Sequence, residues 1–183
     1  MKIAVAGSIA RDHLMTFPGK FTDSIVPEKI EKLSLSFLVD DLEVRRGGTG
    51  ANIAFGLGML GINPILITSA GKDFADYESW LQRHGVDTSH VRISENLLTA
   101  TFTCTTDVEL RQIASFFPGA MSEGREIELG PIVEKVGGIE LLIISPDDPE
   151  AMLRHTEAAK LLNIPFAADP SQTLASIDGE LIK

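Results

Sequence analysis

The chain has 183 residues, a formal net charge of −10 and 44% hydrophobic residues. These values predict a globular protein with a substantial core and exclude a fibrous or wholly disordered chain. The acidic balance disfavours nucleic acid and anionic membranes as partners. A single cysteine, Cys104, excludes an internal disulfide, and four scattered histidines offer no metal-ligand spacing. No apolar stretch is long enough to cross a bilayer, and the N-terminus is not a signal peptide. Together with the cysteine and histidine content, this leads us to expect a soluble, cytoplasmic, metal-free protein.

Short apolar runs alternate with helical patterns along the chain. The runs predict buried parallel strands, because they are rich in Ile, Val or Ala and bounded by turn residues: 2–7, 64–70, 140–145 and 165–169. Helices are predicted between them, three of which end at a glycine: 51–60, 74–84, 126–136 and 149–162. Asp147 or Asp148 is a favourable N-cap for the last helix. The alternation predicts an α/β fold with a doubly wound, mostly parallel sheet.

Two stretches have a period of two instead. Apolar and polar side chains alternate over residues 33–39, and Leu42 and Val44 repeat the pattern after Asp40-Asp41. They also alternate over residues 98–104, which are followed by Gln112–Phe117. This pattern predicts antiparallel strands in a small separate sheet. Residues 178–183 resemble the first turns of a helix that no strand follows, so we expect the doubly wound sheet to be incomplete at its C-terminal side.

Three local features are candidates for ligand binding. Residues 46–52, RGGTGAN, predict either a helix N-terminus that receives a ligand or a tight turn capped by Asn52, and the two interpretations are evenly balanced. Asp12, after the first strand, offers a carboxylate to a vicinal diol, although capping of a local turn is the more common role. Phe102 and Phe116 form either a stacking clamp for a flat ligand or core packing, and residue type alone favours the core.

Several segments together resemble the N-terminal half of the ribokinase-like (PfkB) carbohydrate kinase family: GSIARD, GGTGAN, AGKDFADY and AADPSQ. Longer stretches are similar to the bacterial adenosine kinases of that family: SLSFLVDDLEVRRGG, TFTCTTD, QIASFFPGAMSE and DDPEAM. The resemblance implies that residues 1–183 are the N-terminal part of one ribokinase-like domain, with β-lid strands inserted at about 14–46 and 98–117. It also implies transfer of the ATP γ-phosphoryl to the 5′-hydroxyl of adenosine.

The resemblance further implies a set of substrate-binding residues: Ser8, Asp12, Ser36, Gly48, Asn52, Phe102, Phe116 and Gln172. Asp12 would hold the ribose 2′- and 3′-hydroxyls, aided by the glycine and asparagine of GGTGAN. Phe102 and Phe116 would stack on adenine, and Gln172 would hydrogen-bond its edge, whereas Thr173 departs from a second Gln expected there. The strand at 33–39 would pair with its copy in a homodimer.

The family takes its general base from an Asp in a Gly-Ala-Gly-Asp motif, which these residues lack together with the later segments that bind ATP and Mg²⁺. The base is therefore expected C-terminal to Lys183, and this chain is predicted to supply the acceptor half of a kinase site. Two alternatives stay open. One is a sugar kinase of the ribose or fructose type, which the aromatic pair and Gln172 argue against. The other is a non-catalytic nucleoside-binding or dimerisation fragment, which the missing base supports.

Overall fold

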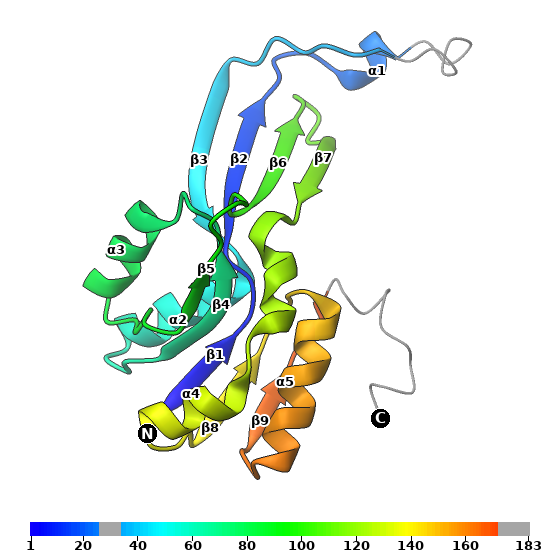
Figure 1. The fold of residues 1–183 in the computed structure, drawn as a ribbon. Helices are drawn as coiled ribbons and strands as arrows, with labels where there is room; N and C mark the ends of the chain where they lie inside the picture. The colour runs from blue at the N-terminus through cyan, green and yellow to red at the C-terminus, as the bar shows by residue number, and fades with distance from the viewer. Residues whose placement is uncertain (26–33, 172–183) are drawn as a thin grey trace. The chain divides into compact units, whose positions relative to one another are not determined.

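The computed structural model describes residues 1–25 and 34–171, which form two compact units (Figure 1). Unit 1 consists of residues 1–10, residues 47–100 and the described residues from 118 onward. Unit 2 consists of the described residues of 11–46 together with residues 101–117. The chain therefore leaves unit 1 twice and returns to it twice. Within residues 1–25 and 34–171, no helix combines the length and hydropathy that a bilayer span requires.

The core of unit 1 is a five-stranded sheet in the order β5-β4-β1-β8-β9, and every neighbouring pair is parallel. Its strands are β1 (Ile3–Ala6), β4 (Ile65–Ala70), β5 (Val91–Ile93), β8 (Leu141–Ile144) and β9 (Phe166–Ala168). β1 is central and pairs with both β4 and β8. Four of the five strands lie where the sequence predicts them. β5 was not predicted, because it is three residues long and partly exposed.

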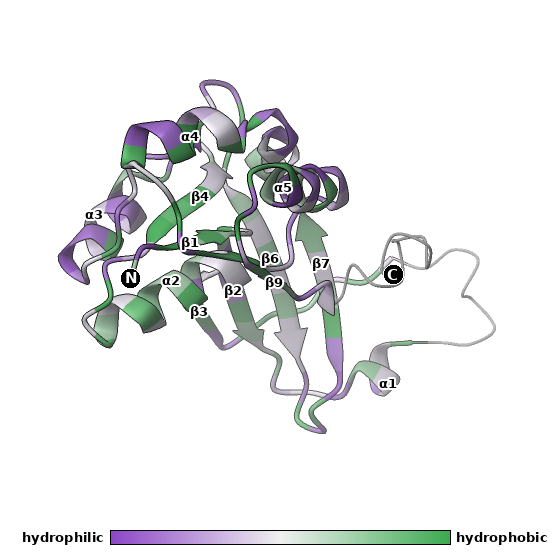
Figure 2. Ribbon diagram, turned by 90° about the horizontal axis from the view of Figure 1, so that it is seen from below, coloured by the Kyte–Doolittle hydropathy of each residue, from purple (hydrophilic) through white to green (hydrophobic). Residues whose placement is uncertain are grey.

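Helices cover both faces of this sheet because both faces are apolar (Figure 2). Val5 and Leu66 pack with α2 (Thr49–Met59) and α3 (Ala75–Arg83) on one face. Their strand neighbours point the other way, toward α4 (Leu129–Val136) and α5 (Pro149–Leu161). A 3₁₀ helix, η2 (Gly119–Glu126), contacts β4 and α5. The predicted doubly wound α/β architecture is confirmed.

Three helix ends and one helix start follow the predicted local chemistry. Gly61, Gly85 and Gly137 have φ values of 78°, 79° and 70°, the left-handed conformation that glycine adopts without strain after a helix. Asp148 is the N-cap of α5, and its Oδ1 accepts the Ala151 N–H at 3.1 Å. α4 begins at Leu129 rather than at residue 126, because the preceding residues form η2.

A second sheet has the order β3-β2-β6-β7. Its strands are β2 (Ala10–Thr16), β3 (Asp41–Gly47), β6 (Ala100–Thr106) and β7 (Gln112–Phe117), with a short helix α1 (Phe21–Ser24) between β2 and β3. β6 and β7 are antiparallel, as predicted. The separate small sheet that the period-two segments predicted is therefore confirmed, and β6 begins two residues later than expected.

The loops of unit 2 are held by a ring cluster and by one buried carboxylate. The Phe37 ring lies 4.9 Å from the rings of both Phe17 and Phe21. Asp107 accepts the Phe21 N–H at 3.1 Å through Oδ2 and the amides of two residues that follow it through Oδ1. Burial by itself raises the pKa of Asp107, but these backbone hydrogen bonds and the nearby guanidinium of Arg111 outweigh it and lower the pKa.

Two predictions for this region were wrong. The structure assigns no strand to residues 34–39, although their burial alternates as the pattern indicated, and residue 33 lies outside the described residues. β3 follows at Asp41–Gly47, where Leu42 and Val44 repeat the pattern, and pairing of residues 33–39 with a second copy stays a prediction. Asp12 was expected at the end of the first strand. It lies within β2, whose Arg, Asp and His residues gave no strand signal.

Candidate functional site

The carboxyl ends of three parallel strands of unit 1 are tied together by backbone hydrogen bonds. The Gly7 N–H donates to Ile67 O at 3.3 Å, and the Ser145 N–H donates to Ala6 O at 2.8 Å. The Ser8 N–H donates to Pro146 O at 3.1 Å. Ligands of open α/β sheets bind at this edge, and the loop after β1 therefore occupies the position where a site is expected.

Ser8 caps helix α2 from outside the helix. The N-cap residue, Gly48, has no side chain to satisfy the first amides of α2. Ser8 replaces it: its Oγ accepts the Thr49 N–H at 3.2 Å, and its backbone oxygen accepts the Ala51 N–H at 3.1 Å. Both bonds hold the N-terminus of α2, and hence the positive end of its dipole, against the loop after β1.

The glycines of this region are needed for close backbone packing. A Cβ on Gly50 would lie 2.6 Å from the Gly7 carbonyl carbon, and a Cβ on Gly7 would lie 2.9 Å from Gly50 Cα. Gly48 has a φ of 91°, and its Cβ would lie 2.5 Å from Ile9 Cα. The Tyr77 hydroxyl donates to Gly47 O at 3.0 Å and fixes the residue just before this turn. The glycine cluster of RGGTGAN thus forms the tight strand-to-helix turn.

Asn52 does not cap α2, so that part of the turn interpretation was wrong. Asn52 lies in the first turn, where its N–H donates to Gly48 O at 3.0 Å. Its side chain is exposed and hydrogen-bonds to none of the described residues. The Asn52 amide is therefore available to a ligand at the edge where Ser8 and Gly48 also lie.

Asp12 lies in unit 2, half-buried on β2. Burial raises the pKa of its carboxyl, while the charges of Arg45 and His13 act in the opposite direction. Arg45 also pairs with Glu43 at 2.7 Å. The carboxyl of Asp12 is thus partly removed from water and close to positive charge, an environment in which hydrogen bonds to a polar ligand are stronger than in bulk water.

Phe102 and Phe116 are direct cross-strand partners on β6 and β7. Directly opposed residues have Cβ atoms about 4.5–5.5 Å apart on the same face of a sheet. The pair therefore forms a platform on one face of the sheet, in which Phe102 is half-buried. Phe116 is 49% exposed, which disfavours core packing. Phe117 is 51% exposed but points to the opposite face, because side chains alternate along a strand.

The structure brings the predicted residues together in two groups. Ser8, Gly48 and Asn52 meet at the start of α2 in unit 1, and the aromatic pair shares one face of the sheet in unit 2. Ser36, also in unit 2, is exposed on a segment without regular secondary structure. Gln172 and Thr173, like the helix expected over 178–183, lie outside the described residues.

Sequence reasoning missed one functional candidate, Asp147. It follows β8 at the carboxyl edge of the sheet and is 5% exposed. Burial, and to a smaller extent the charge of Asp148, raise its pKa to about 7, while an amide hydrogen bond opposes the shift. Perturbed acids gather at functional sites. The available signal was the Asp-Asp pair shortly after a predicted strand, at the start of the DDPEAM stretch.

A match to a known family covers most of the chain. The model of the pfkB family of carbohydrate kinases matches residues 12–177. The chain belongs to this family.

Relatives of this PfkB chain include two nucleoside kinases. The curated nucleoside kinase of Methanocaldococcus jannaschii is 27% identical over 183 residues, which are 99% of this chain and 55% of the relative. The structure of Burkholderia thailandensis nucleoside kinase in complex with inosine has a TM-score of 0.81 and 31% identity, and the match covers 98% of this chain and 55% of that one. The PfkB chain thus spans about half the length of the curated relatives it matches.

The fold comparison agrees with the family match. The crystal structure of the M. jannaschii nucleoside kinase, an archaeal member of the ribokinase family, has a TM-score of 0.81 and 25% identity over 100% of this chain and 56% of that one. The expected ribokinase-like fold is therefore confirmed. Among residues 1–25 and 34–171 of this PfkB chain, no group of three or more His, Cys, Asp or Glu side chains is arranged to hold a metal ion.

Proposed function

We propose that this chain forms the acceptor-binding half of a nucleoside kinase that transfers the γ-phosphoryl of ATP to the 5′-hydroxyl of adenosine. The observation that carries the proposal is the aromatic platform formed by half-buried Phe102 and exposed Phe116. The substrate of a sugar kinase has no base to stack on such a platform. In a nucleoside, stacking of the base on an aromatic side chain contributes about 1–3 kcal/mol to binding. The nucleoside kinases among the relatives support the same choice.

Polar residues supply the complementary contacts in this proposal. The Asp12 carboxylate accepts hydrogen bonds from both ribose hydroxyls, as its acceptor-only chemistry allows. The Asn52 amide, exposed at the start of α2, adds a donor and an acceptor. The Oγ and the backbone oxygen of Ser8 accept amides at the start of α2, so in this proposal Ser8 also positions the helix that carries Asn52.

ATP and Mg²⁺ would be required by the complete enzyme, and no residue of this chain is proposed to bind them. The Burkholderia enzyme has been solved with ADP-inosine, which supports a nucleotide donor in this family. The role proposed for the residues of this chain is to bind and orient the nucleoside.

The test compares two adjacent phenylalanines of equal exposure. Phe116→Ala removes half of the proposed platform, while Phe117→Ala removes a ring from the opposite face of the same strand. Binding of adenosine, inosine and ribose is measured by calorimetry. Phe116→Ala should weaken adenosine binding about 5- to 150-fold and leave ribose binding unchanged, and Phe117→Ala should change neither. Equal losses for the two variants would show general damage to the sheet and refute the platform.

Asp12→Asn tests the ribose contact separately. An amide offers one acceptor oxygen beside an NH₂ donor, so the variant should lose about 10- to 150-fold in affinity for adenosine and for ribose alike. A 2′,3′-dideoxynucleoside, which lacks both hydroxyls, should bind wild type and variant equally. If Asp12→Asn weakens the dideoxy ligand as much as adenosine, Asp12 has a structural role and the assignment is wrong. Ribose binding tighter than adenosine binding would favour the sugar kinase.

A further inference from the structure

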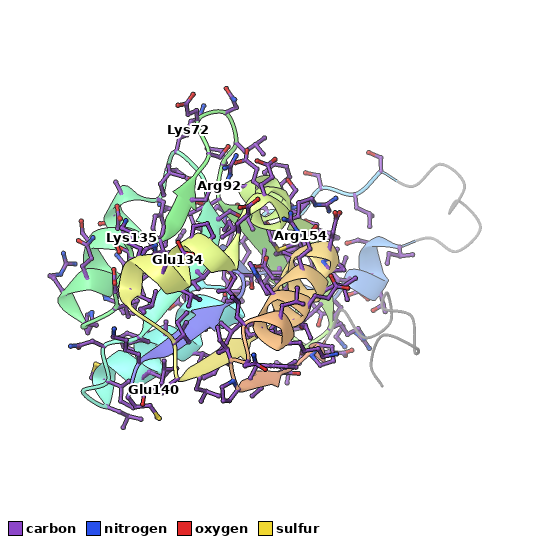
Figure 3. The ribbon with its side chains drawn as sticks, turned by 60° about the horizontal axis from the view of Figure 1, so that its bottom comes forward. Lys72, Arg92, Glu134, Lys135, Glu140 and Arg154 are labelled. Carbon is purple, nitrogen blue, oxygen red and sulfur yellow. The ribbon has the colours of Figure 1, made fainter. Side chains whose placement is uncertain are left out.

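A cavity of about 230 Å³ lies between the N-terminus of α4 and the middle of α5. All of its lining residues belong to unit 1. It is on the sheet face covered by α4 and α5, opposite to the face on which α2 packs. Figure 3 shows Arg154 on α5 and Glu134 and Lys135 on the neighbouring α4. The cavity is therefore separate from α2, the helix of unit 1 that carries the proposed contact of Asn52.

The first amides of α4 belong to residues that line this cavity and have no partner among the described residues. The N-cap residue, Glu128, makes no side-chain cap hydrogen bond. The N–H groups of Leu129 and Gly130, both lining residues, find no acceptor among the described residues. Pro131, at the next position, has no N–H. The start of an eight-residue helix thus presents two free donors and the positive end of its dipole.

A buried imidazole points to a ligand independently of the helix. His155 lines the cavity from α5 and is only 4% exposed, yet its ring hydrogen-bonds to no described residue. Burial, and secondarily the charge of Arg154, lower its pKa to about 4, so the ring is neutral at neutral pH and carries one N–H. The ring nitrogens are not fully enclosed by the described residues, so an acceptor that occupies the cavity can supply the partner that His155 lacks.

Arg154 adds a permanent positive charge at the cavity. Its Nη1 donates to the backbone oxygen of Arg125, and this bond holds the side chain in place. A guanidinium has five N–H donors, so others can bind a ligand. Glu128 is the one acidic residue among those that line the cavity, and its side chain is exposed. The donors named here come from two helices, α4 and α5.

We propose that this cavity binds the phosphate group of a small molecule, held by the amides of Leu129 and Gly130 and by the side chains of Arg154 and His155. A phosphate fits this set better than a planar carboxylate, because its tetrahedral oxygens accept hydrogen bonds from several directions at once. A helix N-terminus paired with an arginine is a common arrangement for phosphate.

The experiment titrates the intact chain with inorganic phosphate and, separately, with glycerol phosphate while the imidazole resonances of the four histidines are followed by NMR. Saturable movement of the His155 resonance, with the other three unmoved, is the expected result. Tighter binding of the ester would identify an organic phosphate as the ligand, and equal binding would identify free phosphate. No saturable movement of His155 with either compound would overturn the proposal.

Matched variants separate a built site from general electrostatics. Arg154→Met should weaken phosphate binding at least about 10-fold, whereas Lys160→Met, which removes an exposed charge from the same helix, should change it less than about 2-fold. Glu128→Gln should strengthen binding, and Glu134→Gln, farther along α4, should not. Equal effects of Arg154→Met and Lys160→Met would show a diffuse attraction to positive charge and would also overturn the proposal. The folded state of each variant is checked by its unfolding midpoint.

Discussion

Alanine at two glycines of helix α2 should have opposite effects on stability. Gly50 and Gly56 lie in the same helix, and the same substitution adds the same methyl group. At Gly50 the new Cβ would lie 2.6, 2.7 and 2.8 Å from the C, Cα and O atoms of Gly7, all of them backbone atoms. At Gly56 it would meet no atom within 4 Å. The pair therefore isolates backbone packing from helix propensity.

The magnitudes follow from these contacts. Replacing glycine by alanine inside a helix gains about 0.8–1 kcal/mol, and Gly56→Ala should show most of that gain. Overpacking costs typically ~1–3 kcal/mol, and Gly50→Ala must displace the backbone at the end of β1 rather than a flexible side chain. Gly50→Ala should therefore be less stable than wild type by about 1–2 kcal/mol, and less stable than Gly56→Ala by ~2–3 kcal/mol.

Urea unfolding of the three proteins, followed by far-UV circular dichroism, measures this difference. In thermal unfolding it should separate the two midpoints by roughly 4–12 °C, since 1 kcal/mol moves the midpoint by about 2–4 °C in a protein of this size. If Gly50→Ala is as stable as Gly56→Ala, then the loop after β1 and the start of α2 are not in fixed backbone contact, and the role assigned to the glycine cluster is wrong.

Three other substitutions have expected outcomes. Asp147→Asn should become more stable than wild type, by up to ~4 kcal/mol, as pH rises from 3.8 to about 7. Across this window the Asp147 carboxyl of wild type ionises in the unfolded state and keeps its proton in the folded state. A pH-independent difference between the two proteins in urea unfolding would contradict this. Asp107→Asn should lower the melting temperature at neutral pH, and the deficit should close below pH 3.8, where the lowered pKa of Asp107 is crossed. Tyr77→Phe should cost about 1–3 kcal/mol by leaving Gly47 O unpaired, and an unchanged melting temperature would refute that bond.

The sheet of unit 1 was predictable because both of its faces are buried. Strands such as β1 and β4 have no exposed face, so their sequences are short, mostly apolar runs. Such runs can be recognised without knowing which strands they pair with. β2 was not predictable, because it belongs to a sheet whose residues are mostly half-exposed and tolerate Arg, Asp and His. In residues 34–39 the alternation correctly gave the half-buried positions. The alternation could not reveal that residues 34–39 form no strand. A strand needs backbone hydrogen bonds to a neighbouring strand, and the burial pattern of the side chains does not report them.

The candidate site was predictable as a set of residues but not in their roles. Ser8 was placed near a ligand, yet its oxygen atoms are occupied by the amides of α2, a contact that joins residues 41 positions apart. Asp147 could not be separated from Asp148 as the helix cap, because that depends on which of two adjacent carboxyls turns toward the core. The pairing of Phe102 with Phe116 rests on the register of β6 and β7, which the sequence leaves free.

The central position of β1 has a consequence for synthesis of the chain. β1 pairs with β4 and β8, so its two neighbours in the sheet are made only after residues 65 and 141 respectively. At about 5–20 residues per second, the ~60 residues between β1 and β4 take roughly 3–12 s to translate. During that time an apolar strand with both edges open leaves the ribosome ahead of everything that will cover it. Nascent chains halted before β4 should therefore bind hydrophobic-segment chaperones through residues 3–6, and chains halted after β8 should release them.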